Sequence, residues 1–196
     1  MKGVDRAVRI FAMVTLAILG TLARSEVVIE GARYETSVVL AGERLELNGV
    51  GVRKRFLFDI YAGGLYVPKR AARAEDLINQ PGPKRVALRF LREVDGELFV
   101  NSLHNGLKAN HSEAELAKWK TQVETLTRTI RTIALARRGE SVHFEYTPQD
   151  GTRVTVNGVT RGPLIPGADF YAAVLRVWLG ETPADAGLKR GMLGAG

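Results

Sequence analysis

The chain has 196 residues, 45% of them hydrophobic and 25% charged, a balance typical of one globular domain that buries its own core. It contains no cysteine, which excludes disulfides, thiolate metal sites and a cysteine nucleophile. The formal net charge is +7, and the first 25 residues carry three of these charges. The remaining excess of +4 is spread along the sequence and does not indicate a nucleic-acid-binding protein.

The first 25 residues have the pattern of a secretory signal peptide. A basic start at 1–9 precedes the apolar stretch IFAMVTLAILGTLA at 10–23, and Ala-Arg-Ser at 23–25 forms a small-x-small cleavage site. The apolar stretch is shorter than the roughly 20 residues that a membrane-spanning helix needs. We therefore expect cleavage after Ser25 or Ala23, export, most simply to a periplasm, and no membrane span in the mature chain. An uncleaved N-terminal anchor is the alternative.

The first half of the remaining chain is rich in strand patterns. Alternating apolar residues from 34 to 67 predict two or three strands, with turns at 41–42 (Ala-Gly) and 48–49 (Asn-Gly). A short helix is expected at 71–79, because Pro-Gly-Pro follows it. The segment 84–94 alternates again and predicts another strand.

The apolar period changes to that of a helix after this strand. Asp95 is placed to cap a helix, and Ser112 with Glu115 forms a capping box. The capping box opens a longer helix with an apolar stripe from Leu116 to Ile133 at helical spacing.

The C-terminal third returns to strands and then to helices. Asp150-Gly151 predicts a turn between two strands, and Asp169 is placed to cap an apolar helix. The expected elements are strands at 141–148 and 152–158, a rigid connection at 162–167, and helices at 170–180 and 184–193. This order predicts one α+β domain from 26 to 196, with a large antiparallel sheet covered on one face by helices.

Three stretches resemble the chalcone isomerase superfamily, and in particular its bacterial chalcone isomerase-like branch. They are GVGVRKR at 49–55, DIYAGGLYV at 59–67 and FYAAVLRVWLGETPADAGLKRGMLG at 170–194. The resemblance covers about residues 45–194 and implies the family's open-faced β-sandwich, with a ligand cleft between sheet and helices. Members include isomerases that cyclise chalcones, fatty-acid-binding proteins that hold a carboxylate with an arginine and a tyrosine, and non-catalytic proteins.

The resemblance also implies site residues. The family arginine corresponds to Arg53, and Tyr61 stands where the isomerases have a threonine and the fatty-acid-binding branch has a tyrosine. The catalytic tyrosine of the isomerases corresponds to Phe99, its nearby asparagine to Asn105 with a shift of one residue, and the threonine of the late helix to Val177. The arginine is present while hydroxyl groups are replaced, which argues against chalcone cyclisation.

The chemistry of Arg53 and Tyr61 allows two interpretations. On one alternating strand, Arg53, Asp59 and Tyr61 share a face. A guanidinium suits a carboxylate bidentately, and a tyrosine hydroxyl adds a further donor. The pair would then hold the acidic end of a ligand. The alternative is a structural ion pair between Arg53 and Asp59, with Tyr61 packed in the sheet.

The three histidines do not have the spacing of a metal site, so we predict neither a metal nor a cofactor. His104 lies on the same expected helix as Phe99 and could face the cleft, as an axial haem ligand or a general base. A histidine on the helix surface or in the core is the alternative.

We therefore predict an exported protein that binds, without catalysis, a small amphipathic or aromatic ligand such as a fatty acid, through Arg53, Tyr61, Phe99, His104 and Val177. One alternative is an isomerase acting on a chalcone-like or other enone, in which Arg53 stabilises an oxyanion and Tyr61 and Asn105 assist. A second alternative is haem or tetrapyrrole binding through His104 or Tyr61.

Overall fold

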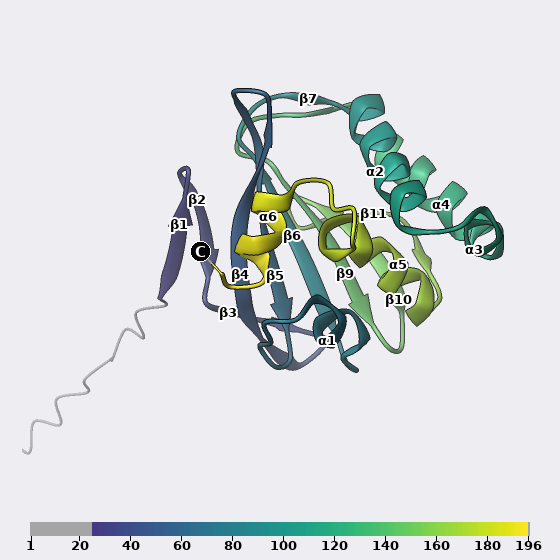
Figure 1. The fold of residues 1–196 in the computed structure, drawn as a ribbon, viewed down its shortest axis with the longest axis horizontal. Helices are drawn as coiled ribbons and strands as arrows, with labels where there is room; N and C mark the ends of the chain where they lie inside the picture. Colours follow the sequence, from purple (N-terminus) through teal and green to yellow (C-terminus); the bar gives the residue numbers. More distant parts are fainter. Residues whose placement is uncertain (1–24, 196) are drawn as a thin grey trace, which may run out of the picture.

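The computed structural model describes residues 25–195, so the predicted signal peptide lies outside the described residues except for Ser25. A seven-stranded antiparallel sheet, in the order β11-β10-β9-β6-β5-β4-β3, forms the centre of the molecule (Figure 1). Its strands are β3 (Ser37–Leu40), β4 (Glu43–Arg55), β5 (Phe58–Val67), β6 (Lys84–Phe90), β9 (Ser141–Thr147), β10 (Gly151–Val156) and β11 (Val159–Ile165).

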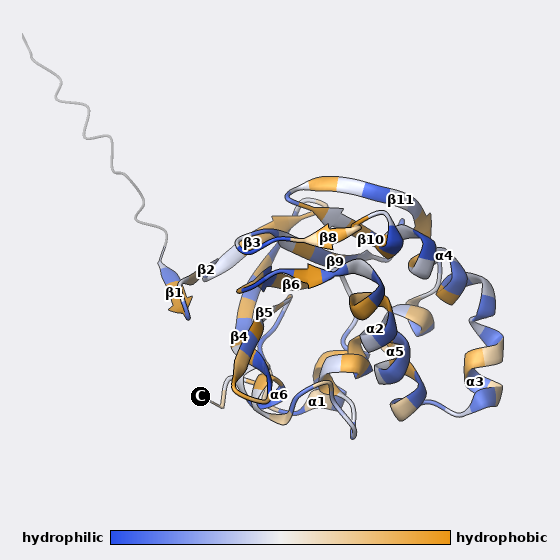
Figure 2. Ribbon diagram, turned by 90° about the horizontal axis from the view of Figure 1, so that it is seen from above, coloured by the Kyte–Doolittle hydropathy of each residue, from blue (hydrophilic) through white to orange (hydrophobic). Residues whose placement is uncertain are grey.

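The helices lie against one face of this sheet, which curls around α2 and α5 (Figure 2). They are α1 (Ala74–Asn79), α2 (Gly96–Asn110), α3 (Glu113–Lys118), α4 (Lys120–Arg131), α5 (Ala168–Leu179) and α6 (Ala186–Met192). Two small sheets complete the fold, β1 (Glu26–Ile29) with β2 (Ala32–Glu35), and β7 (Val94–Asp95) with β8 (Leu135–Ala136). The predicted α+β fold, a large antiparallel sheet covered on one face by helices, is confirmed. Within residues 25–195, no helix is long and apolar enough to cross a bilayer.

Apolar clusters occupy both faces of the sheet. On β6, Val86, Leu88 and Phe90 join the main core between sheet and helices. Ala87, between them in sequence, belongs to a smaller cluster on the other face, where Tyr34 of β2 packs. The period of two in the sequence thus predicts correctly which residues of this strand share a face.

The glycine motif of β4 is a contact surface for α6. A Cβ atom at Gly51 would lie 2.6 Å from the carbonyl oxygen of Leu188, so α6 reaches the strand only because Gly51 has no side chain. The predicted turn at 48–49 is wrong, since β4 continues there past a bulge between Leu47 and Gly49. The buried Asn48 side chain instead donates to the Met192 carbonyl at 2.8 Å and holds the C-terminus on the strand.

Two predicted helix caps in the middle of the chain are confirmed, but the length of one predicted helix is wrong. Asp95 accepts hydrogen bonds from the amides of Glu97 and Leu98 and caps α2, as predicted. The capping box at Ser112 is also confirmed. The single longer helix is wrong, because α3 ends at Lys118 and α4 begins at Lys120.

Two predictions near the C-terminus are corrected. The segment 162–167 is not a rigid connection, since β11 runs to Ile165 as the edge strand and pairs with β10. Asp169 does not cap α5, whose N-cap position is Gly167. The Asp169 carboxylate accepts a hydrogen bond from the indole of Trp119 at 2.8 Å instead, and so ties α5 to the α3–α4 junction.

Candidate functional site

A β-hairpin brings Arg53 and Tyr61 together. Arg53 lies near the end of β4, Tyr61 lies near the start of β5, and the two are direct partners in the antiparallel register. The guanidinium carbon of Arg53 lies 5.6 Å from the centroid of the Tyr61 ring, within the range of a cation–π contact. The prediction that one strand carries both residues is wrong, because the chain turns at Phe56-Leu57 and a bulge follows Arg53.

The alternative ion pair between Arg53 and Asp59 is wrong as well. The Asp59 carboxylate accepts a hydrogen bond from the Lys54 ammonium group at 2.7 Å. Within residues 25–195, no carboxylate forms an ion pair with Arg53. The half-buried guanidinium of Arg53 therefore keeps its hydrogen-bonding edge free of a protein anion.

Tyr61 is a buried residue of the aromatic core. Its hydroxyl accepts a hydrogen bond from the indole N–H of Trp178 at 3.0 Å, and its ring meets Phe90 edge to face. Burial raises the pKa of Tyr61, while the positive charge of Arg53 and the hydrogen bond from Trp178 act in the opposite direction. Because the net shift is upward, the hydroxyl is protonated at neutral pH and is a donor rather than a base.

A cavity of about 270 Å³ opens between the tip of this hairpin and the start of α2. The buried rings of Tyr61, Phe90 and Phe99 form its inner wall, and Arg53 and Arg92 line it as cations. A second cavity of about 440 Å³ shares Arg53 with the first and continues along α2. Ligand pockets in proteins usually measure roughly 300–1,000 Å³, so the two adjoining spaces have the size of a site for a small amphipathic molecule.

Of three other predicted residues, two line these cavities and one does not. Phe99 lies in the wall of the first cavity, with its ring 5.5 Å from that of Phe90. Asn105 is exposed on α2 and lines the second cavity. Val177 lines neither cavity, since it is buried where α5 crosses α2 and sits against Gly106.

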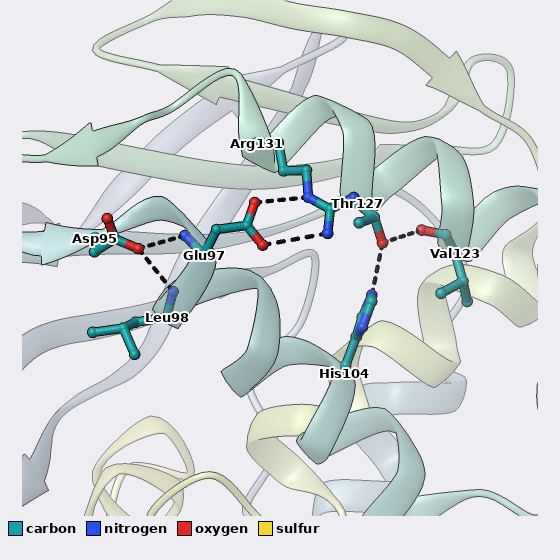
Figure 3. Close-up of polar contacts among 7 residues, drawn as sticks. All are labelled: Asp95, Glu97, Leu98, His104, Val123, Thr127 and Arg131. Atoms are coloured by element: carbon teal, nitrogen blue, oxygen red, sulfur yellow. Dashed lines mark hydrogen bonds and ion pairs between the residues drawn. The ribbon is translucent and has the colours of Figure 1, made fainter.

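His104 lies apart from Arg53 and Tyr61, on the face of α2 that meets α4 (Figure 3). Its Nε2 atom lies 2.7 Å from the hydroxyl oxygen of Thr127, which itself donates to the carbonyl of Val123. The Thr127 oxygen must therefore accept from His104, so Nε2 carries the proton. Burial, with the nearby charges of Lys108 and Arg131, lowers the pKa of His104.

Several residues of the cleft were not predicted from the sequence. Trp178 was not among the predicted site residues, yet it donates a hydrogen bond to the hydroxyl of Tyr61. Arg55 lines both cavities, and Arg92 lies with its guanidinium carbon 4.3 Å from the ring centroid of Phe58. The run of basic residues at 53–55 was a visible signal for Arg55, whereas nothing in the local sequence pairs Arg92 with Phe58.

The charged groups around the cleft are mostly cations. Among the described residues that line the two cavities, Glu93 alone has a carboxylate and none is a histidine. The cations of Arg53, Arg55 and Arg92 surround a largely aromatic wall. Such an arrangement favours a molecule with an anionic end and an apolar body.

Comparisons with known proteins agree with this fold. A family model described as chalcone isomerase-like matches residues 26–194. A search among curated proteins found no match. The crystal structure of a fatty-acid binding protein from Arabidopsis thaliana has a TM-score of 0.67 to this chain at 18% sequence identity, covering 86% of this chain and 96% of that one. That likeness shows the shared fold. Because the family model spans nearly all of the described residues, the chain belongs to the chalcone isomerase-like family.

Proposed function

We propose that this is an exported binding protein for an amphipathic carboxylic acid, such as a fatty acid, and that it does not catalyse chalcone cyclisation. Arg53 holds the carboxylate, and the apolar body of the ligand lies against Phe90 and Phe99. The observation that carries the proposal is the position of Arg53, a half-buried cation that lies at an aromatic cavity and forms no ion pair within residues 25–195. The fatty-acid binding protein of the same fold supports this choice of ligand class.

In this proposal, Tyr61 mainly positions the guanidinium of Arg53. Its hydroxyl is buried and already accepts from Trp178, so the ring supports the guanidinium of Arg53 from one side. The export part of the proposal is supported by the signal-peptide pattern of residues 1–25.

The first test is native mass spectrometry of the protein expressed with its N-terminal segment. We expect the mass of a chain that begins at Glu26 or Arg24, together with a co-purified acid that organic extraction identifies. A full-length chain would contradict the export proposal. A protein without bound acid, which also fails to bind added saturated fatty acids, would contradict the binding proposal.

The second test is the Arg53→Ala variant, titrated with a saturated fatty acid by calorimetry. Loss of one or two charge-assisted hydrogen bonds, each about 1.5–3 kcal/mol, should weaken binding by about 10- to 150-fold or more. The exposed Arg161 on β11 is the matched control, and Arg161→Ala should bind like the wild type. Equal affinities of Arg53→Ala and the wild type would contradict the role of Arg53.

An enone isomerase remains the second candidate, because Arg53 and the protonated hydroxyl of Tyr61 are both donors that can stabilise an oxyanion. Turnover of a chalcone or another enone that disappears in Arg53→Ala would favour this candidate over binding.

The haem alternative is tested with the same preparation, since a bound porphyrin would show a Soret band. His104 would have to give up its hydrogen bond to Thr127 before Nε2 could bind iron.

A further inference from the structure

The tip of the β4–β5 hairpin is an exposed apolar surface. Phe56 is 87% exposed, Leu57 is 97% exposed, and Phe58 follows them with more than half of its surface in solvent. Leu98, at the start of α2 on the other side of the first cavity, is 58% exposed. We call Phe56, Leu57, Phe58 and Leu98 the apolar tip. Phe56 and Phe58 are the only large aromatic side chains among residues 25–195 with such exposure.

The geometry of the turn does not explain why these residues are apolar. Phe56 has a φ of 54°, a left-handed conformation that glycine or asparagine adopts with least strain. A phenylalanine at this position costs backbone energy and also leaves its ring in water. Backbone strain and exposure at one residue point to a function for the side chain outside the folding of this chain.

Basic residues surround the apolar tip. Arg53, Lys54 and Arg55 precede it on β4, and Arg92 lies over the ring of Phe58. Four carboxylates lie nearby. Asp59 pairs with Lys54, Asp185 accepts a hydrogen bond from the Lys54 amide, and Glu30 also acts on Lys54 electrostatically, while Glu93 lines the first cavity. Within residues 25–195, none of these carboxylates forms an ion pair with Arg53, Arg55 or Arg92. The surface therefore combines exposed apolar side chains at the tip with three arginines beneath it that form no ion pair within residues 25–195.

This combination matches the interface of an anionic lipid bilayer. Aromatic and leucine side chains partition into the boundary between headgroups and acyl chains, while arginine and lysine side chains meet the lipid phosphates. Basic residues near such a surface add electrostatic attraction that depends on anionic lipid and weakens with salt. The positive charge beneath the tip favours this occupant over an apolar patch of another protein.

We propose that the apolar tip docks the protein on an anionic phospholipid bilayer and so places the mouth of the cavity at the membrane surface. The inference deepens the proposed function, on which it rests, because it makes the bilayer the source or the destination of the amphipathic acid. Phe56, Phe58 and Leu98 belong both to the tip and to the lining of the first cavity, so a ligand moving between bilayer and cavity passes along apolar side chains.

Co-sedimentation with vesicles tests the docking. Wild-type protein should bind vesicles of equal parts phosphatidylglycerol and phosphatidylcholine, bind pure phosphatidylcholine at least about tenfold more weakly, and lose binding as salt rises. Leu57→Asp should lower the partition coefficient on the anionic vesicles by about tenfold or more, since it removes the most exposed apolar side chain and adds a repelled charge. Val39→Asp is the matched control, because Val39 is 68% exposed on β3 and lies away from the hairpin tip.

Leu57 does not line either cavity, so Leu57→Asp should keep the wild-type affinity for a soluble fatty acid in the absence of vesicles. Retained vesicle binding by Leu57→Asp, or an equal loss in Val39→Asp, would overturn the docking proposal. A wild type that binds neither vesicle would overturn it too and would point to a protein partner for the tip. These outcomes are distinct from a failure of the proposed function, which would appear as absent fatty-acid binding in solution.

Discussion

At the scale of single residues, the site depends on one hydrogen bond between two side chains of the aromatic core. The indole of Trp178 donates to the hydroxyl of Tyr61, and both residues are almost fully buried. A buried polar group that loses its partner costs about 1–3 kcal/mol, which is more than the bond contributes when both partners are present. The bond therefore fixes the ring of Tyr61, and that ring in turn lies beneath Arg53.

A double-mutant cycle tests this coupling. Tyr61→Phe should leave the indole N–H of Trp178 unpaired and lower the free energy of unfolding by about 1–3 kcal/mol, measured by urea denaturation. Trp178→Phe should cost at least as much, because it also removes buried volume. The double variant should be less destabilised than the sum of the two single variants by about 0.5–3 kcal/mol. Additive effects would show that the bond does not contribute to stability.

At the scale of elements, the glycine motif of β4 and the C-terminal motif are both accounted for by one contact between β4 and α6. The glycines of β4 and the C-terminal helix α6 lie far apart in sequence, yet they meet backbone to backbone. Gly191 of α6 is packed as closely as Gly51, because a Cβ atom at Gly191 would collide with the carbonyl oxygen of Val50. The strand that carries Arg53 therefore pairs with β5 along its edge and packs against α6 through Gly51, two residues before Arg53.

Alanine should lower stability at a glycine packed against backbone, and much less at an exposed glycine of the same helix. Gly51→Ala should lower the free energy of unfolding by about 1–3 kcal/mol, because α6 must move away from β4. Gly187→Ala is the matched control in α6, because the residue is exposed and its Cβ would meet only side-chain atoms, the Asp185 carboxylate at 3.1 Å and Arg190 at 3.7 Å, so its effect should be well below that of Gly51→Ala. Thermal unfolding of both variants measures the difference. A Gly51→Ala protein as stable as the wild type would contradict the close packing.

At the scale of the whole molecule, titratable groups on the two sides of the sheet make stability depend on pH in the same direction. On the helical side, burial together with Lys108 and Arg131 lowers the pKa of His104. On the other face, burial acts to raise the pKa of Glu145, but His143 and Arg85 outweigh it and the net shift is downward. Arg85 lies 2.7 Å from the Glu145 carboxylate.

Both pKa shifts predict that the free energy of unfolding falls as the pH is lowered. For each group the unfolded chain binds a proton at a higher pH than the folded chain does, so stability rises with pH. The contribution of His104 is present above its ordinary pKa of about 6.5 and is lost as pH falls through its lowered folded value. The contribution of Glu145 is present above its ordinary pKa of about 4.5 and is lost as pH falls through its lowered folded value.

Urea midpoints between pH 7.5 and pH 5 measure the histidine contribution. The wild-type midpoint should fall across this range, whereas His104→Gln should show a flatter dependence, because glutamine still donates to Thr127 but does not titrate. Thr127→Val, unlike His104→Gln, removes the hydrogen bond itself and should lower the free energy of unfolding at both ends of the range. Parallel pH curves for the wild type and His104→Gln would contradict the assignment to His104.

The sequence by itself determined the features that depend on neighbours a few residues away. The cap at Asp95, the capping box at Ser112 and the alternating faces of β6 arise from hydrogen bonds and side-chain directions within one or two turns or strand repeats. The glycine and C-terminal motifs also indicated the family correctly.

Only the tertiary structure decided the composition of the site. The turn at Phe56-Leu57 contains no glycine, asparagine or proline, so the local pattern predicted one strand where a hairpin places Arg53 opposite Tyr61. The partner of Tyr61 is 117 residues away, and the partner of His104 lies on another helix. Such contacts follow from how the sheet curls and how the helices cross it, which no periodicity within a single element can specify.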